Sequence, residues 1–197
     1  MSRTKCKQKH AEIVKIAKRL FLAQGFASVS MDLISKESGV SKNTLYSHFL
    51  NKEDLFSFVL QSHWEDDDKP DLDPNDPREL KVILNEYATL LMTYLYKKET
   101  LGFFRLLAHE SNRLPSLAGS IITDELSPSS HLLTRYFMQS LRKDESQASS
   151  LAIIFLGLLK EDPFWHVLVG FRKPYSKKQL KEHIEKMVNI FLTLLES

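Results

Sequence analysis

Apolar positions recur at helical spacing along nearly the whole chain. Between Ile13 and Phe21 they lie 0, 3, 4, 7 and 8 positions after Ile13, which places them on one face of a helix. Between Leu180 and Leu195 they lie 0, 4, 7, 8, 11, 12 and 15 positions after Leu180, again on one helical face. No alternating segment rich in Val, Ile and Thr predicts a strand. The pattern predicts an all-α fold with helices over about 7–24, 31–38, 42–48, 51–64, 77–97, 100–112, 115–126, 128–143, 145–160, 163–170 and 177–196.

Residues that favour helix ends support these boundaries. Ser30 and Ser41 can each accept a hydrogen bond from a free N–H group at the start of a helix, and Asn51 can do the same for the helix that follows. The acidic segment 65–77 contains three prolines and has no periodicity, so we expect a loop there. Asp76, followed by Pro77, is expected to begin the next helix.

Residues 30–48 have the features of a helix-turn-helix. Gly39 permits a tight turn between two short helices, and the second helix carries small polar side chains. The same spacing also occurs in surface helix pairs of ordinary bundles, which is the alternative interpretation. The expected apolar contacts come from Leu33, Ile34, Val40, Leu45 and Phe49, and the outward candidates are Lys42, Asn43, Thr44, Ser47 and His48.

Charge separates the two ends of the chain. Residues 1–55 carry ten Lys and Arg and five Asp and Glu, a net charge of +5, whereas the whole chain has +2 and the remainder therefore −3. A basic end on a slightly acidic body is typical of a nucleic-acid-binding protein. No uncharged apolar stretch approaches the roughly 18 residues of a membrane span, and no signal-peptide run follows the basic start. We therefore expect a cytoplasmic protein.

The composition argues against several kinds of site. Cys6 is the only cysteine, so an internal disulfide is excluded, and the seven histidines show no zinc-ligand spacing. A phosphate-binding glycine loop and a nucleophile–base motif are also missing from the sequence. We expect no metal, no cofactor and no enzymatic activity.

Side-chain chemistry suggests how the second helix of the motif would contact DNA. Asparagine pairs bidentately with adenine and lysine with guanine, so Asn43 and Lys42 are candidate base readers. The Tyr46 hydroxyl suits a phosphate oxygen. Asn43 can equally be a residue that favours a helix start.

Residues 25–55 contain a long motif that extends beyond the helix-turn-helix on both sides. Its characteristic positions are Gly25, Phe26, Ser30, Ile34, Gly39, Val40, Ser41, Thr44, Leu45, Tyr46, His48, Phe49, Lys52, Glu53 and Leu55. At these positions the segment resembles the N-terminal domain of TetR-type (tetracycline-repressor-like) regulators. Ser35 and Ser38 depart from that pattern where small alanines are usual, and Asn43 stands where glycine is common. Residues 103–119 and 158–170 also resemble the C-terminal domain of one branch of the family.

The resemblance implies a division of the chain and roles for its residues. Residues 1–55 would form the DNA-binding domain, and residues 56–197 a helical domain for effector binding and dimerisation. The partners would be double-stranded DNA, a second copy of the chain and an unidentified small molecule. Contacts to phosphates or bases are implied for Ser30, Ser41, Lys42, Asn43, Thr44, Tyr46, His48 and Lys52.

In such regulators the last two long helices build a four-helix dimer interface. Helix 145–160 is apolar nearly all round from Leu151 to Leu159, which fits this role, although a fully buried central helix would have the same pattern. The expected interface residues are Leu151, Phe155, Leu159, Ile184, Val188 and Phe191.

An effector pocket would use the aromatic and apolar residues of the C-terminal domain, but such residues at helical spacing also form ordinary cores. The sequence thus favours a homodimeric repressor that a small molecule releases from a palindromic operator. The alternative is an architectural or protein-interaction DNA-binding factor without an effector. The candidate pocket residues are Trp64, Tyr87, Leu91, Tyr94, Phe104, Leu107, Phe137 and Trp165.

Overall fold

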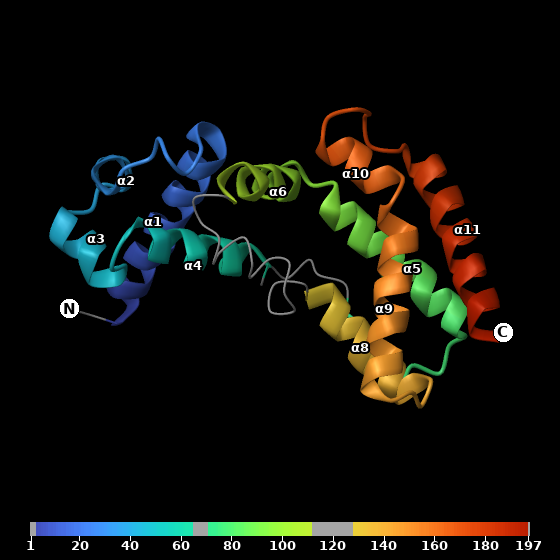
Figure 1. The fold of residues 1–197 in the computed structure, drawn as a ribbon. Helices are drawn as coiled ribbons and strands as arrows, with labels where there is room; N and C mark the ends of the chain where they lie inside the picture. Colours follow the sequence, from blue (N-terminus) through green and yellow to red (C-terminus); the bar gives the residue numbers. More distant parts are fainter. Residues whose placement is uncertain (1–2, 65–70, 112–127, 197) are drawn as a thin grey trace. The chain divides into compact units, whose positions relative to one another are not determined.

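The computed structural model describes residues 3–64, 71–111 and 128–196, and all regular structure in these ranges is helical (Figure 1). The predicted all-α fold is confirmed. The predicted helix 115–126 and most of the predicted loop 65–77 lie outside the described residues. The helices are α1 (Arg3–Gln24), α2 (Met31–Ser38), α3 (Lys42–His48), α4 (Lys52–Trp64), α5 (Leu80–Leu95), α6 (Lys98–Glu110), α8 (Pro128–Ser140), α9 (Glu145–Lys160), α10 (Pro163–Leu168) and α11 (Lys177–Glu196).

The described residues form two compact units. Unit 1 contains residues 3–64 and 102–111, and unit 2 contains residues 71–101 and 128–196. Each unit has its own apolar interior. None of the described helices is long and apolar enough to cross a membrane.

In unit 1, α1 packs against both α2 and α4, and α2 packs against α3. The helical face predicted from Ile13 to Phe21 is buried except for the half-buried Ile16, and both end residues have no exposed surface. Ile34 of α2 and Leu45 of α3 are also fully buried. Burial of these aliphatic side chains fixes the two short helices on the longer α1.

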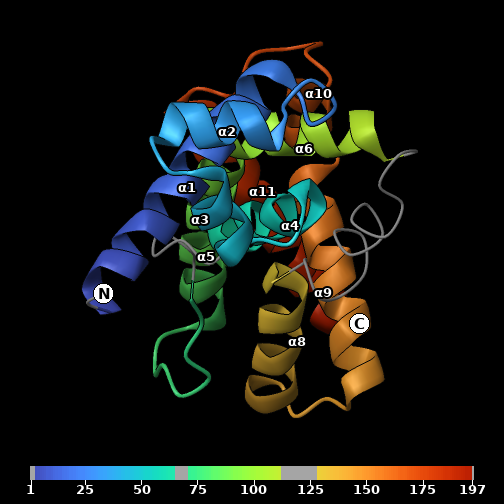
Figure 2. The same ribbon diagram turned by 90° about the vertical axis from the view of Figure 1, so that its left-hand side faces the viewer.

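In unit 2, α9 contacts α8, α5, α10 and α11, and α11 also contacts α5. Figure 2 shows α8 and α9 side by side, joined by a short connection. The centre of the unit is aromatic: the Phe191 ring lies 5.5 Å from the Phe137 ring and 4.9 Å from the Phe155 ring, centroid to centroid. All three rings are fully buried.

Several predicted helix starts are confirmed by capping hydrogen bonds. The Ser41 hydroxyl accepts from the Thr44 backbone N–H at 3.2 Å, and the Asn51 side chain accepts from that of Asp54 at 2.7 Å. Asp144 caps α9 in the same manner, and its carboxylate accepts from the Gln147 N–H at 2.9 Å. These bonds join residues three positions apart, so short sequence patterns predict them well.

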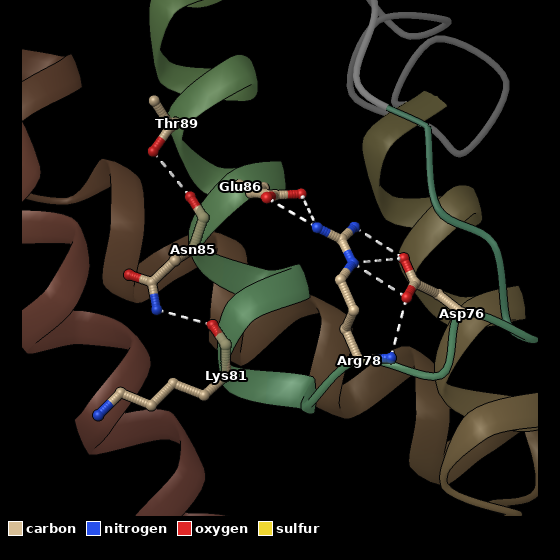
Figure 3. A network of polar contacts seen from close by, with 6 residues as sticks. All are labelled: Asp76, Arg78, Lys81, Asn85, Glu86 and Thr89. Carbon is tan, nitrogen blue, oxygen red and sulfur yellow. Dashed lines mark hydrogen bonds and ion pairs between the residues drawn. The ribbon is translucent and has the colours of Figure 1, made fainter.

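The start of α5 differs from the prediction. The Asp76 carboxylate accepts from the Arg78 backbone N–H at 3.0 Å and also pairs with the Arg78 guanidinium at 2.7 Å. The same guanidinium reaches Glu86 on α5 at 2.8 Å (Figure 3). Asp76 therefore forms a turn with Arg78 in place of a helix cap, and α5 begins at Leu80, later than predicted.

Candidate nucleic-acid interface

The turn between α2 and α3 has the geometry that the sequence predicts. Gly39 adopts a left-handed conformation with φ of 67°, and its N–H donates to the Lys36 carbonyl at 3.3 Å. Residues with a Cβ rarely adopt this conformation, which explains the glycine. The turn places the start of α3 directly after the end of α2, with Ser41 as its N-cap.

The polar side chains of α3 lie on its solvent side. Lys42, Asn43 and Tyr46 are exposed, whereas Thr44 and His48 are half-buried. Leu45 faces the interior. Of the predicted DNA contacts on α3, the structure therefore exposes Lys42, Asn43 and Tyr46 and partly covers the other two.

Ser30 and Ser41 are exposed and act as helix caps. The Ser30 hydroxyl accepts from the Leu33 N–H at 3.1 Å. The Ser41 hydroxyl lies 2.9 Å from that of Thr44 as well as capping α3. These bonds engage the hydroxyls locally, and the contacts of Ser30, Ser41 and Thr44 with DNA stay predictions.

Lys52 occupies a different environment from the one predicted. Its ammonium group donates to the carbonyls of Phe26 and Val29, both at 2.8 Å, and lies 4.3 Å from the centre of the Phe26 ring. These carbonyls belong to the segment that joins α1 to α2. Lys52 therefore ties α4 to this segment in the free protein, and a simple phosphate contact does not describe its position.

Lys42 also has a partner that the sequence analysis missed. Its ammonium group lies 2.7 Å from a carboxylate oxygen of Asp32, in the first turn of α2. A local sequence pattern cannot predict this pair, because the two residues are ten positions apart and their proximity depends on how α2 and α3 pack. The pair places an acidic group on the surface that is otherwise expected to meet DNA.

His48 contacts a second histidine, which the sequence analysis also missed. The His10 ring of α1 lies 5.4 Å from the His48 ring and stacks on Phe49 at 4.9 Å, between centroids. It also lies nearly perpendicular to the Phe58 ring, with 4.6 Å between the centroids. Partial burial lowers the pKa of His10 below its ordinary 6.5, and the charge of protonated His48 lowers this pKa further.

The predicted effector-pocket residues divide between the two units. Trp165 is 46% exposed on α10, and its place in a pocket stays a prediction; the side chain of Trp64 lies outside the described residues. Burial raises the pKa of the Tyr87 hydroxyl. Tyr87, Leu91, Tyr94 and Phe137 are buried in unit 2, while Leu107 is buried and Phe104 half-buried in unit 1.

The predicted dimer-interface residues need a correction. Phe155, Leu159, Ile184, Val188 and Phe191 are at most 1% exposed within one chain, and Leu151 is half-buried. A second chain cannot contact the five buried side chains without opening the core of unit 2. The apolar pattern of α9 and α11 therefore reports mainly packing within the protomer.

No group of three His, Cys, Asp or Glu side chains that could hold a metal occurs in the described ranges. The functional surface is instead a helix-turn-helix whose second helix exposes lysine, asparagine and tyrosine. Together with two helical units, this arrangement defines a helix-turn-helix DNA-binding protein.

Family comparisons agree with this class. Residues 13–58 match the model of bacterial regulatory proteins of the tetR family, and residues 82–194 match that of the AefR-like transcriptional repressor C-terminal domain. The chain belongs to the TetR family of bacterial regulatory proteins. It is thus a DNA-binding transcriptional regulator.

Similar proteins and structures show where the resemblance lies. An HTH-type transcriptional regulator from Staphylococcus aureus (strain USA300) is 41% identical over 59 residues, 30% of this chain and 32% of the relative. The match thus spans about a third of the curated relative. A TetR-family regulator from Mesorhizobium loti MAFF303099 has the same fold, with a TM-score of 0.83 at 23% identity over 98% of each chain. The flavonoid-responsive regulator FrrA reaches 0.77 at 27% identity, over 95% of this chain and 97% of its own.

Replacing Lys52 by alanine is expected to lower the free energy of unfolding by about 1.5–3 kcal/mol, because carbonyls bound to a charged group lose their donor. Chemical denaturation of the full chain measures this change. Lys42→Ala is the matched control and should cost less than about 1 kcal/mol, since its ion pair is exposed. Unchanged stability of Lys52→Ala, with a DNA-binding salt slope lower by about one unit, would restore the phosphate-contact interpretation.

Stability should also fall as the pH is lowered from 7 to 5. The pKa of His10 is lower in the folded chain, so the unfolded chain takes up the proton first and is favoured as the pH falls below the ordinary value. His10→Phe keeps the aromatic contacts and cannot be protonated, and should flatten this part of the curve of unfolding free energy against pH. His131→Phe, at an exposed position on α8, is the control. Equal curves for wild type and His10→Phe would contradict the assignment.

Proposed function

We propose that the protein is a homodimeric transcriptional repressor that binds a palindromic operator through α3 and leaves it when a small molecule binds the C-terminal domain. In this division residues 1–55 bind DNA, and residues 56–197 bind the effector and dimerise. The observation that carries the proposal is the exposed polar face of α3, held on a buried support by the turn at Gly39. Such a helix has the size and chemistry to enter the major groove.

The proposed base readers are Lys42 and Asn43, and the proposed phosphate contacts are made by Ser30, Ser41, Thr44, Tyr46 and His48. Lys42 and Asn43 are the first two residues of α3, and both are exposed. The N-terminal residues of a recognition helix are those that usually reach base edges. Hydroxyl groups at helix starts, in contrast, suit phosphate oxygens.

The dimer proposal rests on apolar side chains that are exposed on the surface of one chain. On α9, Ile153 is 63% exposed and Ile154 is 45% exposed; on α11, Ile190 and Leu194 are 39% and 51% exposed. The two helices pack against each other within unit 2. An exposed apolar set on neighbouring helices is typical of a surface that another protein chain covers. These four residues replace the buried set predicted from the sequence.

Support for an effector is chemical. The interior of unit 2 is rich in aromatic rings, and a structural neighbour at 27% identity is named as flavonoid-responsive. An aromatic interior favours a flat aromatic ligand such as a flavonoid. An architectural DNA-binding factor would use the same α3 but would not respond to any small molecule.

Selection of bound sequences from random DNA by the full-length protein tests the proposal. The selected sites are expected to be palindromes with half-sites about one helical turn apart or a multiple of it, because a two-fold dimer presents two copies of α3. Asn43→Gly should change the ranking of single-base variants, by about 1–3 kcal/mol at one position in each half-site. Its affinity for random duplex should stay the same.

Asymmetric single-copy sites would contradict the proposed dimer on DNA. An unchanged ranking with Asn43→Gly would leave Asn43 as a helix-start residue. Repeating the titration with a pool of small aromatic molecules that includes flavonoids should release the protein from the selected DNA. A DNA affinity that no effector pool changes would favour the architectural factor.

Leu194→Glu is expected to raise the dimer dissociation constant about ten-fold or more, because two-fold symmetry places the new charge in the interface twice. Light scattering against concentration measures the shift from about twice 22.8 kDa towards 22.8 kDa. Leu90→Glu on α5 is the matched control, since Leu90 is 52% exposed and Leu194 is 51% exposed. A wild-type particle of 22.8 kDa at micromolar concentration, or equal effects of both variants, would contradict the proposed interface.

A further inference from the structure

An acidic side chain lies on the helix-turn-helix beside the candidate base reader. Asp32 is in the first turn of α2, and its carboxylate lies 2.7 Å from the ammonium group of Lys42, in the first turn of α3. Both side chains are largely exposed, 64% for Asp32 and 61% for Lys42. The pair is therefore on the surface and does not belong to the core that holds the two helices together.

An exposed ion pair of this kind is weak, because water screens the charges and both side chains lose freedom when they pair. Lys42 can therefore leave Asp32 when another partner offers better geometry. A guanine edge with its O6 and N7 acceptors is such a partner, as is a phosphate oxygen at the right distance. A phosphate at random distance competes less well with a carboxylate that is already in contact.

We propose that Asp32 determines specificity by holding Lys42 until DNA supplies a correctly placed acceptor. This inference rests on the proposed function, since it requires α3 to face DNA. Asp32 is a positioning residue, which acts on DNA recognition through Lys42.

The pairing changes non-specific binding more than specific binding. Binding to random duplex depends mainly on cationic side chains that neutralise phosphates and release counterions. While Lys42 remains on Asp32, it contributes little to this general attraction. At a selected site Lys42 exchanges its partner, so its contribution appears only where the sequence is right.

The experiment titrates the full-length protein against a duplex selected from random DNA and against a scrambled duplex of the same length, at several salt concentrations. Asp32→Asn keeps the shape of the side chain and removes its charge. It should raise affinity for the scrambled duplex about three- to ten-fold and steepen the salt slope by about one unit. Affinity for the selected duplex should rise less, so that the ratio of the two affinities falls at least three-fold.

Glu37→Gln is the matched control. Glu37 is also on α2 and forms an exposed ion pair, with Arg19 at 2.8 Å, so its replacement removes the same charge from the same helix without freeing Lys42. The affinity ratio should then stay within two-fold of wild type. Asp32→Glu keeps the negative charge and should leave the affinity ratio at its wild-type value. In a Lys42→Ala background, Asp32→Asn should have no effect on this ratio.

Three results would overturn the inference alone: an unchanged ratio with Asp32→Asn, an equal fall with Glu37→Gln, or an effect of Asp32→Asn that persists without Lys42. Each assumes that the wild-type protein prefers the selected duplex. A wild-type protein that binds both duplexes equally would contradict the proposed function, and the inference with it. The two failures are therefore distinguishable.

Discussion

The turn at Gly39 and the two aliphatic side chains beneath it, Ile34 and Leu45, set the direction of α3. A helix of seven residues is too short to be stable alone, so its position depends on tertiary contacts. Both aliphatic side chains are fully buried in unit 1, where α2 packs on α1 and on α3. Because the Leu45 side of α3 packs against this support, the polar residues of α3 lie towards the solvent.

The positive charges of residues 1–55 are less available to DNA than the sequence suggests. Residues 1–55 carry a formal net charge of +5, yet some of their lysines are already engaged in the free protein. Lys52 donates to backbone carbonyls of the α1–α2 connection, and Lys42 pairs with Asp32. A count of charges therefore overstates the general attraction for phosphates. We infer that part of the basic charge stabilises the motif and that part is released only on recognition.

Local patterns predicted the described helices, several of their caps and the motif, because a cap joins residues three positions apart and a helical face repeats every three to four. Contacts between helices were not predictable in this way. Whether Lys52 meets a phosphate or a carbonyl depends on how α4 packs, and the proximity of His10 to His48 depends on how α1 meets α3. For α9, the apolar pattern extends round the helix, so it could not show that Phe155 is buried while Ile153 is exposed.

The central claim is that α3 reads bases in the major groove. The most direct measurement replaces each purine of a selected duplex in turn by its 7-deaza analogue, which lacks the N7 acceptor of the major groove, and measures the affinity of the full-length protein. Lys42 and Asn43 would pair with guanine and adenine through that atom. The account predicts weakened binding at one or two purines in each half-site, at symmetry-related positions. Unchanged affinity at every purine would contradict it.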